Sequence, residues 1–313
     1  MSRLQSVSAS PMLQQFAQGA AQSALMPVAN FIAPTVDVST SVGRYKVYTA
    51  KNRFHIPETL RAIGGRAAEL RFDASDATYN CEPHALDYPV DNLEKLEEAQ
   101  IKDTLEEAAT AISQVAALAH EKTVLDAAVA AVGNGTNKVW NASADPVADI
   151  DAAILADIET CKFGSLMNVG VLFGASAWNL FKTAPAVRSR FIVGGSNKGG
   201  LGLAVATESI ASQLFIGNPD VRTSYMVFDA AAEGLPESIS FLLDTAVLIF
   251  ARLIAPTRLD PSFMKTFRLM GQYMVPGSYV RDDGRVEVAK FDWSEDVKVT
   301  NSAGCLRLNV SAS

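Results

Sequence analysis

The chain has 313 residues, 49% hydrophobic side chains and a formal net charge of −7. It is long enough to bury a sizeable core, and its length predicts about two domains. The negative charge argues against a phosphate-binding surface spread over the whole protein, because nucleic-acid binding rests on Lys and Arg. No segment reaches the roughly 18 consecutive apolar residues of a membrane-spanning helix, and the N-terminus lacks the unbroken apolar run of a signal peptide.

The three cysteines are Cys81, Cys161 and Cys305, an odd number with wide spacing. This pattern fits neither a disulfide framework nor a set of zinc ligands. We therefore expect reduced, buried thiols in a cytosolic compartment.

Residues 1–43 are rich in Ala, Gln and Ser, and only Arg3 and Asp37 are ionisable. Such a segment can hold a short helix at about residues 11–24 but cannot form a core alone. We predict an N-terminal arm that lies against another surface.

A basic hairpin follows this arm. Polar and apolar residues alternate over 44–49 and again over 68–72, and Gly64 and Gly65 lie between them. Alternation predicts strands, and glycine suits the tight turn near the tip. Residues 44–73 contain seven basic and three acidic side chains, a local balance of +4.

The most regular segment is a predicted helix over residues 91–132, with Asp91 or Asn92 as the N-cap and Gly133 after its end. A helix of that length spans about 60 Å. It contains nine acidic residues and three lysines, a balance of −6. Its predicted apolar stripe consists of Ile101, Leu105, Ala108, Ile112, Val115 and Ala119.

The second half of the chain alternates helical and strand patterns, which predicts an α+β protein without internal repeats. Helices are expected at 146–161, 176–184 and near Glu208, strands at 167–173 and 213–216, and apolar runs at 224–228 and 246–253. Residues 266–308 are predicted to be rich in strands, with a turn at Asp283 and Gly284.

No group of residues has the spacing of a catalytic or metal site. His55, His84 and His120 are scattered, and His120 lacks the second histidine four residues on that a zinc protease helix needs. A thiol and imidazole pair of Cys81 and His84 would have weak geometry in a loop. The acidic cluster at residues 94–98 is better explained as a solvated or partner-facing helix surface.

Two glycine-containing segments also lack the pattern of a functional loop. The run at 194–202 has no Gly-Lys-Ser/Thr ending, so a surface loop is favoured over a phosphate-binding loop. Ser176 is not flanked by the two glycines of a nucleophile elbow and is predicted to be a helix N-cap. We therefore expect no enzyme activity, no cofactor and no metal.

The order of these elements resembles the Hong Kong 97-type capsid fold of tailed-bacteriophage major capsid proteins. In that family a loose arm and an extended two-stranded loop precede a long spine helix, a mixed α/β segment and closing strands. The stretches that carry the resemblance are 53–67, 79–86, 168–174, 178–181, 185–188, 213–218 and 261–267. The resemblance extends over nearly the whole chain, but these stretches are packing patterns and not chemical motifs.

The resemblance implies a division into an N-terminal arm (1–43), an extended loop (44–90), a peripheral domain (91–165 and 257–313, with the spine helix at about 91–132) and an axial domain (166–256). It implies a structural protein that assembles as hexamers and pentamers into an icosahedral shell around double-stranded DNA, without sequence-specific binding. The protein would be part of the virion, assembled in the host cytoplasm. An encapsulin-like nanocompartment shell is the alternative.

The resemblance also implies partners: a portal protein, a separate scaffolding protein because the arm begins directly at Met1, and in some cases a decoration protein. Some relatives join subunits covalently through a lysine near the loop tip, whereas here the tip carries arginines and Lys51 lies back along the strand. We therefore expect non-covalent contacts between the basic loop and the acidic helix of the next subunit. The residues assigned to these contacts are Arg53, Arg61, Arg66, Arg71, Glu94, Glu97, Glu98, Glu106 and Glu107.

Overall fold

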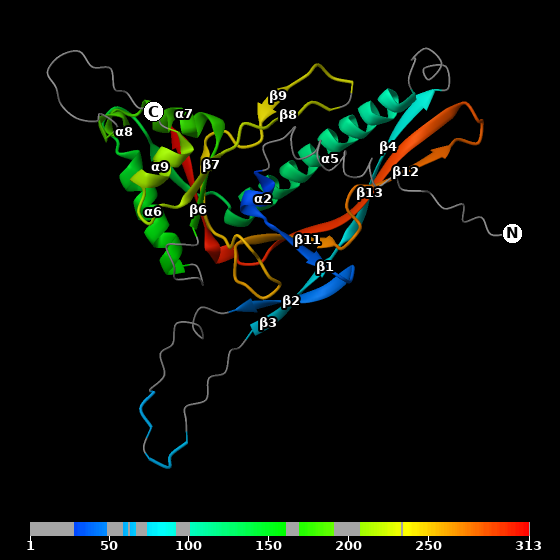
Figure 1. Cartoon of the computed structure of the whole chain (residues 1–313). Coiled ribbons are helices and arrows are strands. Elements are labelled where there is room, and N and C mark those ends of the chain that lie inside the picture. The colour runs from blue at the N-terminus through cyan, green and yellow to red at the C-terminus, as the bar shows by residue number, and fades with distance from the viewer. Residues whose placement is uncertain are drawn as a thin grey trace.

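The computed structural model describes residues 28–48, 59–61, 63–66, 74–91, 101–160, 169–190, 207–232 and 234–312. Two five-stranded sheets and one long helix dominate the described chain. Figure 1 shows one sheet surrounded by short helices at one end of the molecule and a long, strand-built ribbon at the other, with a hairpin projecting from between them.

The first sheet has the order β1-β11-β13-β12, and β4 pairs with β13. Only β1 and β11 are parallel. The turn between β12 and β13 contains Gly284 at φ 68°, which confirms the predicted turn. The strands are β1 (Thr35–Val38), β4 (Glu82–Asp91), β11 (Met264–Leu269), β12 (Val275–Val280) and β13 (Val286–Val299).

The predicted N-cap at Asp91 is wrong. Asp91 is the last residue of β4 and pairs with Val286, and the neighbouring Val90 is buried. Asp91 therefore pairs with β13 as part of a strand and does not cap the long helix. Asn92 lies outside the described residues.

The second sheet has the order β5-β14-β10-β6-β7. Every residue of β6 and β10 is buried, which explains why both segments are continuous apolar runs. Four helices lie around this sheet: α6 (Pro146–Thr160), α7 (Ala175–Thr183), α8 (Pro185–Arg190) and α9 (Glu208–Leu214). The strands are β5 (Thr136–Val139), β6 (Val169–Phe173), β7 (Asp220–Thr223), β10 (Ala246–Ala251) and β14 (Cys305–Ser311).

This sheet combines segments from both expected domains. β5 and β14 come from residue ranges assigned to the peripheral domain, whereas β6, β7 and β10 come from the axial range. The division of the chain at residues 165 and 257 therefore does not follow the sheets, because the C-terminal strand pairs directly with β10.

The predicted strand at 213–216 is wrong. Gln213 and Leu214 end α9, and Phe215 is buried against Phe173 and Phe181 with ring centroids 6.4 and 5.6 Å away. The apolar residues thus close a helix over the core and do not extend a sheet. This is the ambiguity expected of short apolar runs.

The predicted cap of α7 is also wrong. The N-cap is Gly174, and Ser176 lies inside the helix, where its N–H donates to the Asp244 carboxylate at 3.2 Å. A side chain at Gly174 would meet the backbone of Asp244, which excludes a larger capping residue there. Asp244, which lies just before β10 and far from α7 in the sequence, therefore caps this helix.

The long helix α5 (Ile101–Val132) has 32 residues, or about 48 Å, and its side chains are described from residue 107 onwards. Ala108 and Ile112 are buried as predicted, but Val115 is 55% exposed and Ala119 is exposed. The buried stripe continues instead through Ala116, Val124 and Ala128. The step after Ile112 is four residues and not three, so the stripe follows the other i, i+3/i+4 register.

The last part of the N-terminal arm is part of the core. Helix α2 (Ala29–Ile32) packs against α5, and Phe31 meets Phe250 of β10 edge to face at 5.3 Å. This confirms that the arm needs a surface, because α2 has only four residues and cannot be stable alone. The helix predicted at 11–24 lies outside the described residues.

The extended hairpin is formed by β2 (Val42–Tyr48) and β3 (Ala74–Asn80), which pair antiparallel. It confirms the first predicted strand, shifted by two residues at its start. Residues 68–72 lie outside the described chain, so the predicted return strand is not tested there. Gly64 has φ 83°, as a glycine turn near the tip requires.

One buried carboxylate provides a pH-dependent test of the packing. Asp157 of α6 has no exposed surface, its carboxylate has no hydrogen-bond partner among the described residues, and burial raises its pKa to about 7. Because its folded pKa lies above the unfolded value of about 3.9, folding loses stability as the pH rises between these values, by up to about 4 kcal/mol.

Asp157→Asn should therefore raise the melting temperature at pH 8 and change it little at pH 4, measured by thermal denaturation of the full chain. Glu159→Gln, at an exposed position of the same helix, is the matched control and should have no effect at either pH. A destabilised Asp157→Asn protein at pH 8 would contradict the assignment.

Candidate functional site

The base of the extended hairpin is fixed to the first sheet by aromatic stacking. Tyr45 and Tyr79 stack on Phe267 of β11 with centroid distances of 5.5 and 4.6 Å. The Asn80 N–H donates to the Asp296 carboxylate at 2.7 Å. A Cβ at Gly43 would overlap the Tyr79 hydroxyl and ring, so only glycine fits beside that ring. The hairpin thus leaves the body from a rigid base.

The positive charge of the hairpin is partly neutralised near this base. Arg44 and Lys46 pair with Asp76 of β3 at 3.8 and 2.5 Å. The hydrogen bond from Lys46 holds the pKa of Asp76 below its ordinary value. Asp76 is not among residues 44–73, whose charge balance is +4. It neutralises Arg44 and Lys46 in part, so the basic residues without an acidic partner in the described loop are Arg61 and Arg66 near the tip.

The described tip, residues 59–61 and 63–66, is exposed and partly apolar. Leu60 is 86% exposed and Ile63 is fully exposed. Arg61 and Arg66 are exposed, and the Arg61 guanidinium donates to the Gly65 carbonyl at 3.0 Å. Apolar side chains on a protruding turn lack any packing within the described chain, which is typical of a surface that contacts another molecule.

The predicted contact residues are only partly within the described structure. Arg61 and Arg66 lie at the tip and Glu107 is exposed on α5, whereas the side chain of Glu106 is not described. Figure 1 shows the tip and α5 on opposite sides of the molecule, so one chain does not bring them together. The remaining predicted contact residues, Arg53, Arg71, Glu94, Glu97 and Glu98, lie outside the described residues.

A buried polar cluster joins α5 to the first sheet. His120 Nδ1 lies 2.9 Å from Oε1 of Glu295 in β13, and the Arg268 guanidinium of β11 donates to Oε2 at 3.1 Å. Arg268 also lies over the Tyr273 ring, 3.6 Å from its centroid. Burial raises the pKa of Glu295, but the hydrogen bond with His120 and the Arg268 charge outweigh it and hold the pKa at about 2.

This cluster was not predicted from the sequence, in which His120 was found only to lack the partner of a zinc site. Glu295 follows Phe291 and Trp293 at a spacing of two residues, and all three are buried. The strand alternation therefore placed Glu295 on the core face. The sequence could therefore predict that Glu295 is buried. It could not predict the contact with His120, which lies 175 residues away in the chain.

Replacing Glu295 tests the cluster. Because its folded pKa lies below the unfolded value, Glu295 stabilises the fold above about pH 4.5, and this is lost as the pH falls toward 2. Glu295→Gln should lower the free energy of unfolding at pH 7 by about 3 kcal/mol, and the difference from wild type should shrink below pH 4, measured by urea denaturation. Glu82→Gln, exposed and opposite Glu295 in the strand ladder, is the control.

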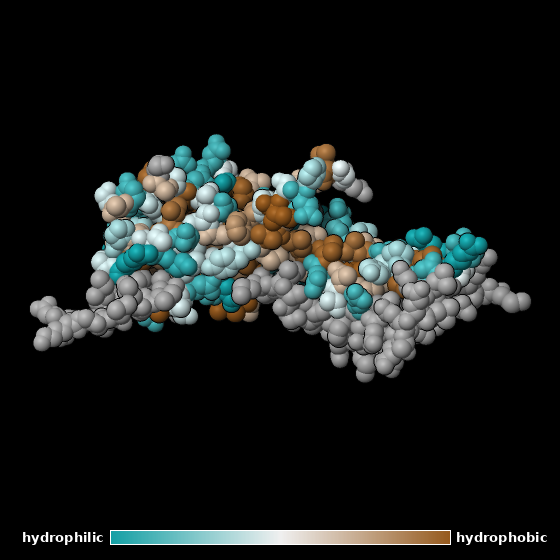
Figure 2. Space-filling view, turned by 90° about the horizontal axis from the view of Figure 1, so that it is seen from above, coloured by the Kyte–Doolittle hydropathy of each residue, from teal (hydrophilic) through white to brown (hydrophobic). Residues whose placement is uncertain are grey.

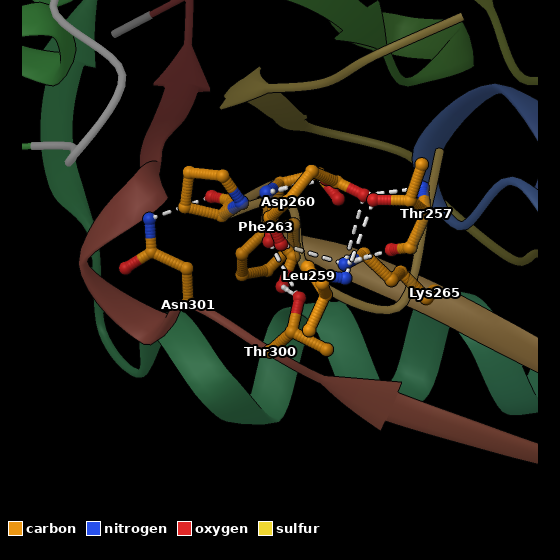
Figure 3. A network of polar contacts seen from close by, with 9 residues as sticks. Thr257, Leu259, Asp260, Phe263, Lys265, Thr300 and Asn301 are labelled. Carbon is orange, nitrogen blue, oxygen red and sulfur yellow. Dashed lines mark hydrogen bonds and ion pairs between the residues drawn. The ribbon is translucent and has the colours of Figure 1, made fainter. Parts of the chain in front are cut away.

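A second buried network fixes the connection from β10 to β11 (Figure 3). Lys265 has no exposed surface, and its ammonium lies 3.0 Å from the Asp260 carboxylate and donates to the carbonyls of Thr257 and Asp260 at 2.7 and 2.6 Å. Burial raises the pKa of Asp260, but hydrogen bonds with Ser262 and Lys265 hold it below its ordinary value. Thr300 and Asn301 bond the carbonyls of residues 261–263.

This connection lines a cavity of about 760 Å³ beside β1, and Tyr79 is part of the same lining. The exposed side chains Ile254 and Leu259 belong to its lining. The network therefore sets the shape of a surface hollow next to the base of the hairpin.

Lys265→Met should destabilise the chain by about 3–5 kcal/mol, because it leaves the Asp260 carboxylate buried without its cation. The control, Lys46→Met, removes the exposed ion pair with Asp76 and should change stability by less than about 1 kcal/mol. Thermal and urea denaturation measure both; equal effects would show that the buried pair contributes no more than the exposed one.

The other candidate residues are not brought together. The Cys81 thiol lies 3.6 Å from the Phe267 carbonyl, whereas His84 stacks on Trp293 at 5.5 Å. Cys81 and Cys305 are buried free thiols, and burial raises the pKa of both. His55, Cys161 and the glycine run at 194–202 lie outside the described residues. Within the described chain no three or more His, Cys, Asp or Glu residues gather as metal ligands, and none of its helices has the length and apolar character of a membrane span.

No family model and no curated protein matches the chain. Solved structures do match. A phage-related protein from Bordetella bronchiseptica is 16% identical with a TM-score of 0.70, covering 96% of this chain and 97% of that one. The capsid of cyanophage P-SCSP1u is 10% identical with a TM-score of 0.55, covering 90% and 87%.

An encapsulin complex from Synechococcus elongatus is 9% identical with a TM-score of 0.54, covering 91% of this chain and 88% of that one. Identities this low establish the fold alone. The chain has the Hong Kong 97-type capsid fold, which confirms the predicted fold class.

Proposed function

We propose that this chain is the major capsid protein of a tailed bacteriophage. The observation that carries the proposal is the match of nearly its whole length to a phage-related protein and to a phage capsid. In the proposed role, copies associate as pentamers and hexamers into an icosahedral shell that encloses double-stranded DNA and becomes part of the virion.

The extended hairpin supports this role. Its base is fixed by Phe267, and its described tip exposes Leu60 and Ile63 with no packing in the described part of its own chain. A rigid projection with an apolar end is suited to contact a second subunit. In this proposal the hairpin is the extended loop, α5 is the spine helix, and the two sheets are the centres of the peripheral and axial domains.

The charge of the chain supports enclosure of DNA over tight binding. With 27 basic and 34 acidic residues the protein does not present the overall positive charge of a DNA-binding surface. The proposed role is structural, without catalysis. Its partners would be a portal, a scaffolding protein and, in some phages, a decoration protein.

An encapsulin-like compartment shell is the second candidate, because an encapsulin complex has the same fold. The two functions differ in content: a capsid encloses nucleic acid, a compartment encloses a cargo protein. Neighbouring genes for a terminase and portal favour the capsid, whereas a gene for a cargo enzyme favours the compartment.

The test is electron microscopy of the protein expressed alone and together with its neighbouring genes. Closed shells that contain nuclease-protected DNA when the neighbouring genes are present support the capsid. Shells that contain a protein cargo and no DNA support the compartment. Monomers only, under every condition, would overturn both.

Charge at the loop tip provides a kinetic prediction. Arg61→Glu with Arg66→Glu should slow assembly at least about tenfold at low salt and weaken its salt dependence, because opposite charges steer association. Light scattering measures the rate. Arg61→Lys with Arg66→Lys keeps the charge and should assemble at nearly the wild-type rate. Unchanged kinetics in the glutamate variant would contradict electrostatic steering by the loop.

A further inference from the structure

The two-stranded sheet of β8 (Val227–Asp229) and β9 (Ile239–Phe241) has no buried residue. Its strands have three residues each and pair only with one another. A two-stranded hairpin of this kind is marginally stable in water unless another surface covers it. This sheet therefore lacks, within the described chain, the packing that sheets normally have.

The strand register defines the two faces of this sheet. Phe228 pairs with Ser240, and its ring lies 4.6 Å from the Lys122 ammonium, so this face is turned toward α5. Val227 and Phe241, which pair with each other, point to the opposite face together with Ile239. All three are exposed, between 43% and 61%.

We call the surface formed by Val227, Ile239 and Phe241 the outer face. Two further exposed apolar residues, Tyr225 and Leu235, lie in the adjoining segments. Figure 2 looks onto this side of the molecule and shows hydrophobic side chains gathered in the middle, where β8 and β9 cross above α5. An apolar patch of this kind in a folded protein marks a contact with another molecule.

The segment that forms the outer face carries charge of one sign; the nearby Lys122 ammonium belongs to α5 and lies on the opposite face of the sheet, over Phe228. Residues 223–251 contain four acidic residues, Asp229, Glu233, Glu237 and Asp244, and no Lys or Arg. The loop tip has the complementary composition: residues 59–66 contain two arginines and no acidic residue, together with Leu60 and Ile63. Each surface thus combines apolar side chains with one sign of charge, and the signs are opposite.

We propose that the outer face of β8 and β9 receives the extended-loop tip of a second copy of this chain. Leu60 and Ile63 pack on Val227, Ile239 and Phe241, and Arg61 lies near Glu237. The inference rests on the proposed self-assembly and specifies one of its contacts.

The positions of the two surfaces favour a contact between copies. Figure 1 shows the loop tip and the β8–β9 sheet on opposite sides of the molecule, so a chain cannot cover its own outer face with its own tip. A contact between two different surfaces is head-to-tail, and such a contact closes a ring when its repeated rotation adds up to one full turn. Rings of five or six subunits are the capsomers that a shell requires.

Site-directed cross-linking tests this pairing. Ile63→Cys and Ile239→Cys are made in separate full-length chains that carry Cys161→Ser, and the two chains are mixed, assembled and oxidised. We expect a disulfide-linked dimer on a non-reducing gel from the mixture and not from either chain alone. Val280→Cys, an exposed position in β12, replaces Ile239→Cys in the control mixture and should yield at least tenfold less dimer.

Charge reversal is the second test. Arg61→Glu slows assembly, and adding Glu237→Arg to the same chain should restore at least half of the lost rate, because the pair forms with its signs exchanged. Ile239→Ser with Phe241→Ser should reduce the assembly rate about tenfold while leaving the circular dichroism spectrum of the subunit unchanged.

The outcomes separate the inference from the proposed function. If wild-type shells form but the Ile63 and Ile239 positions do not cross-link above the Val280 control, the inference is overturned and the shell function stands. If the Glu237→Arg exchange restores nothing, the proposed charge pair is wrong. If wild type never assembles, the proposed function fails and the inference fails with it.

Discussion

The pairing of β13 with its neighbours is the constraint on which the other contacts depend. β13 pairs with β4 over ten residues along one edge, while β11 and β12 share the other edge. Its inward side chains, Phe291, Trp293 and Glu295, meet α5. The extended hairpin continues directly into β4 and rests on β11 through Phe267. The helix and the hairpin therefore take their directions from one strand.

Two clusters of buried charged residues fix how the parts around β13 and β11 are arranged. The pairs of Glu295 with His120 and Arg268, and of Lys265 with Asp260, are largely removed from water. Apolar side chains of similar volume often stabilise a fold at least as well as a buried ion pair. What charged groups add is direction, because their hydrogen bonds accept only one arrangement of the partners. They are found where α5 joins the sheet and where the chain passes from β10 to β11.

The fold class could be predicted from the sequence because it depends on long helical and strand patterns, which are visible without tertiary contacts. The length of α5, the apolar runs of β6 and β10, and the glycine turns at Gly64 and Gly284 are all local signals. The errors fell where tertiary contacts decide between local alternatives. Asp91 joined a strand because β13 lay beside it, and Asp244 capped α7 from a distant segment.

The candidate contacts between subunits were only partly accessible to the sequence. Clusters of charge identified the loop tip, since Arg61 and Arg66 stand in a short segment without acidic residues. The outer face of β8 and β9 was not identified, because its apolar residues look like core residues until the strand register shows which side they occupy. The sequence of one chain also does not show which residues contact another subunit. An isoleucine becomes a candidate contact residue only when the structure shows that its side chain is exposed.

The base of the hairpin has a mechanical consequence. Tyr79 is wedged between Gly43 and Phe267, so the two strands leave the body as one stiff unit. A small rotation about this pivot would sweep the distant tip through a much larger arc. In the proposed shell, where one sequence would build both five-membered and six-membered rings, such leverage would be useful. Shell curvature in that proposed assembly would then be adjusted by tilting the whole stiff hairpin about its aromatic base, with little change to the cores of the two sheets.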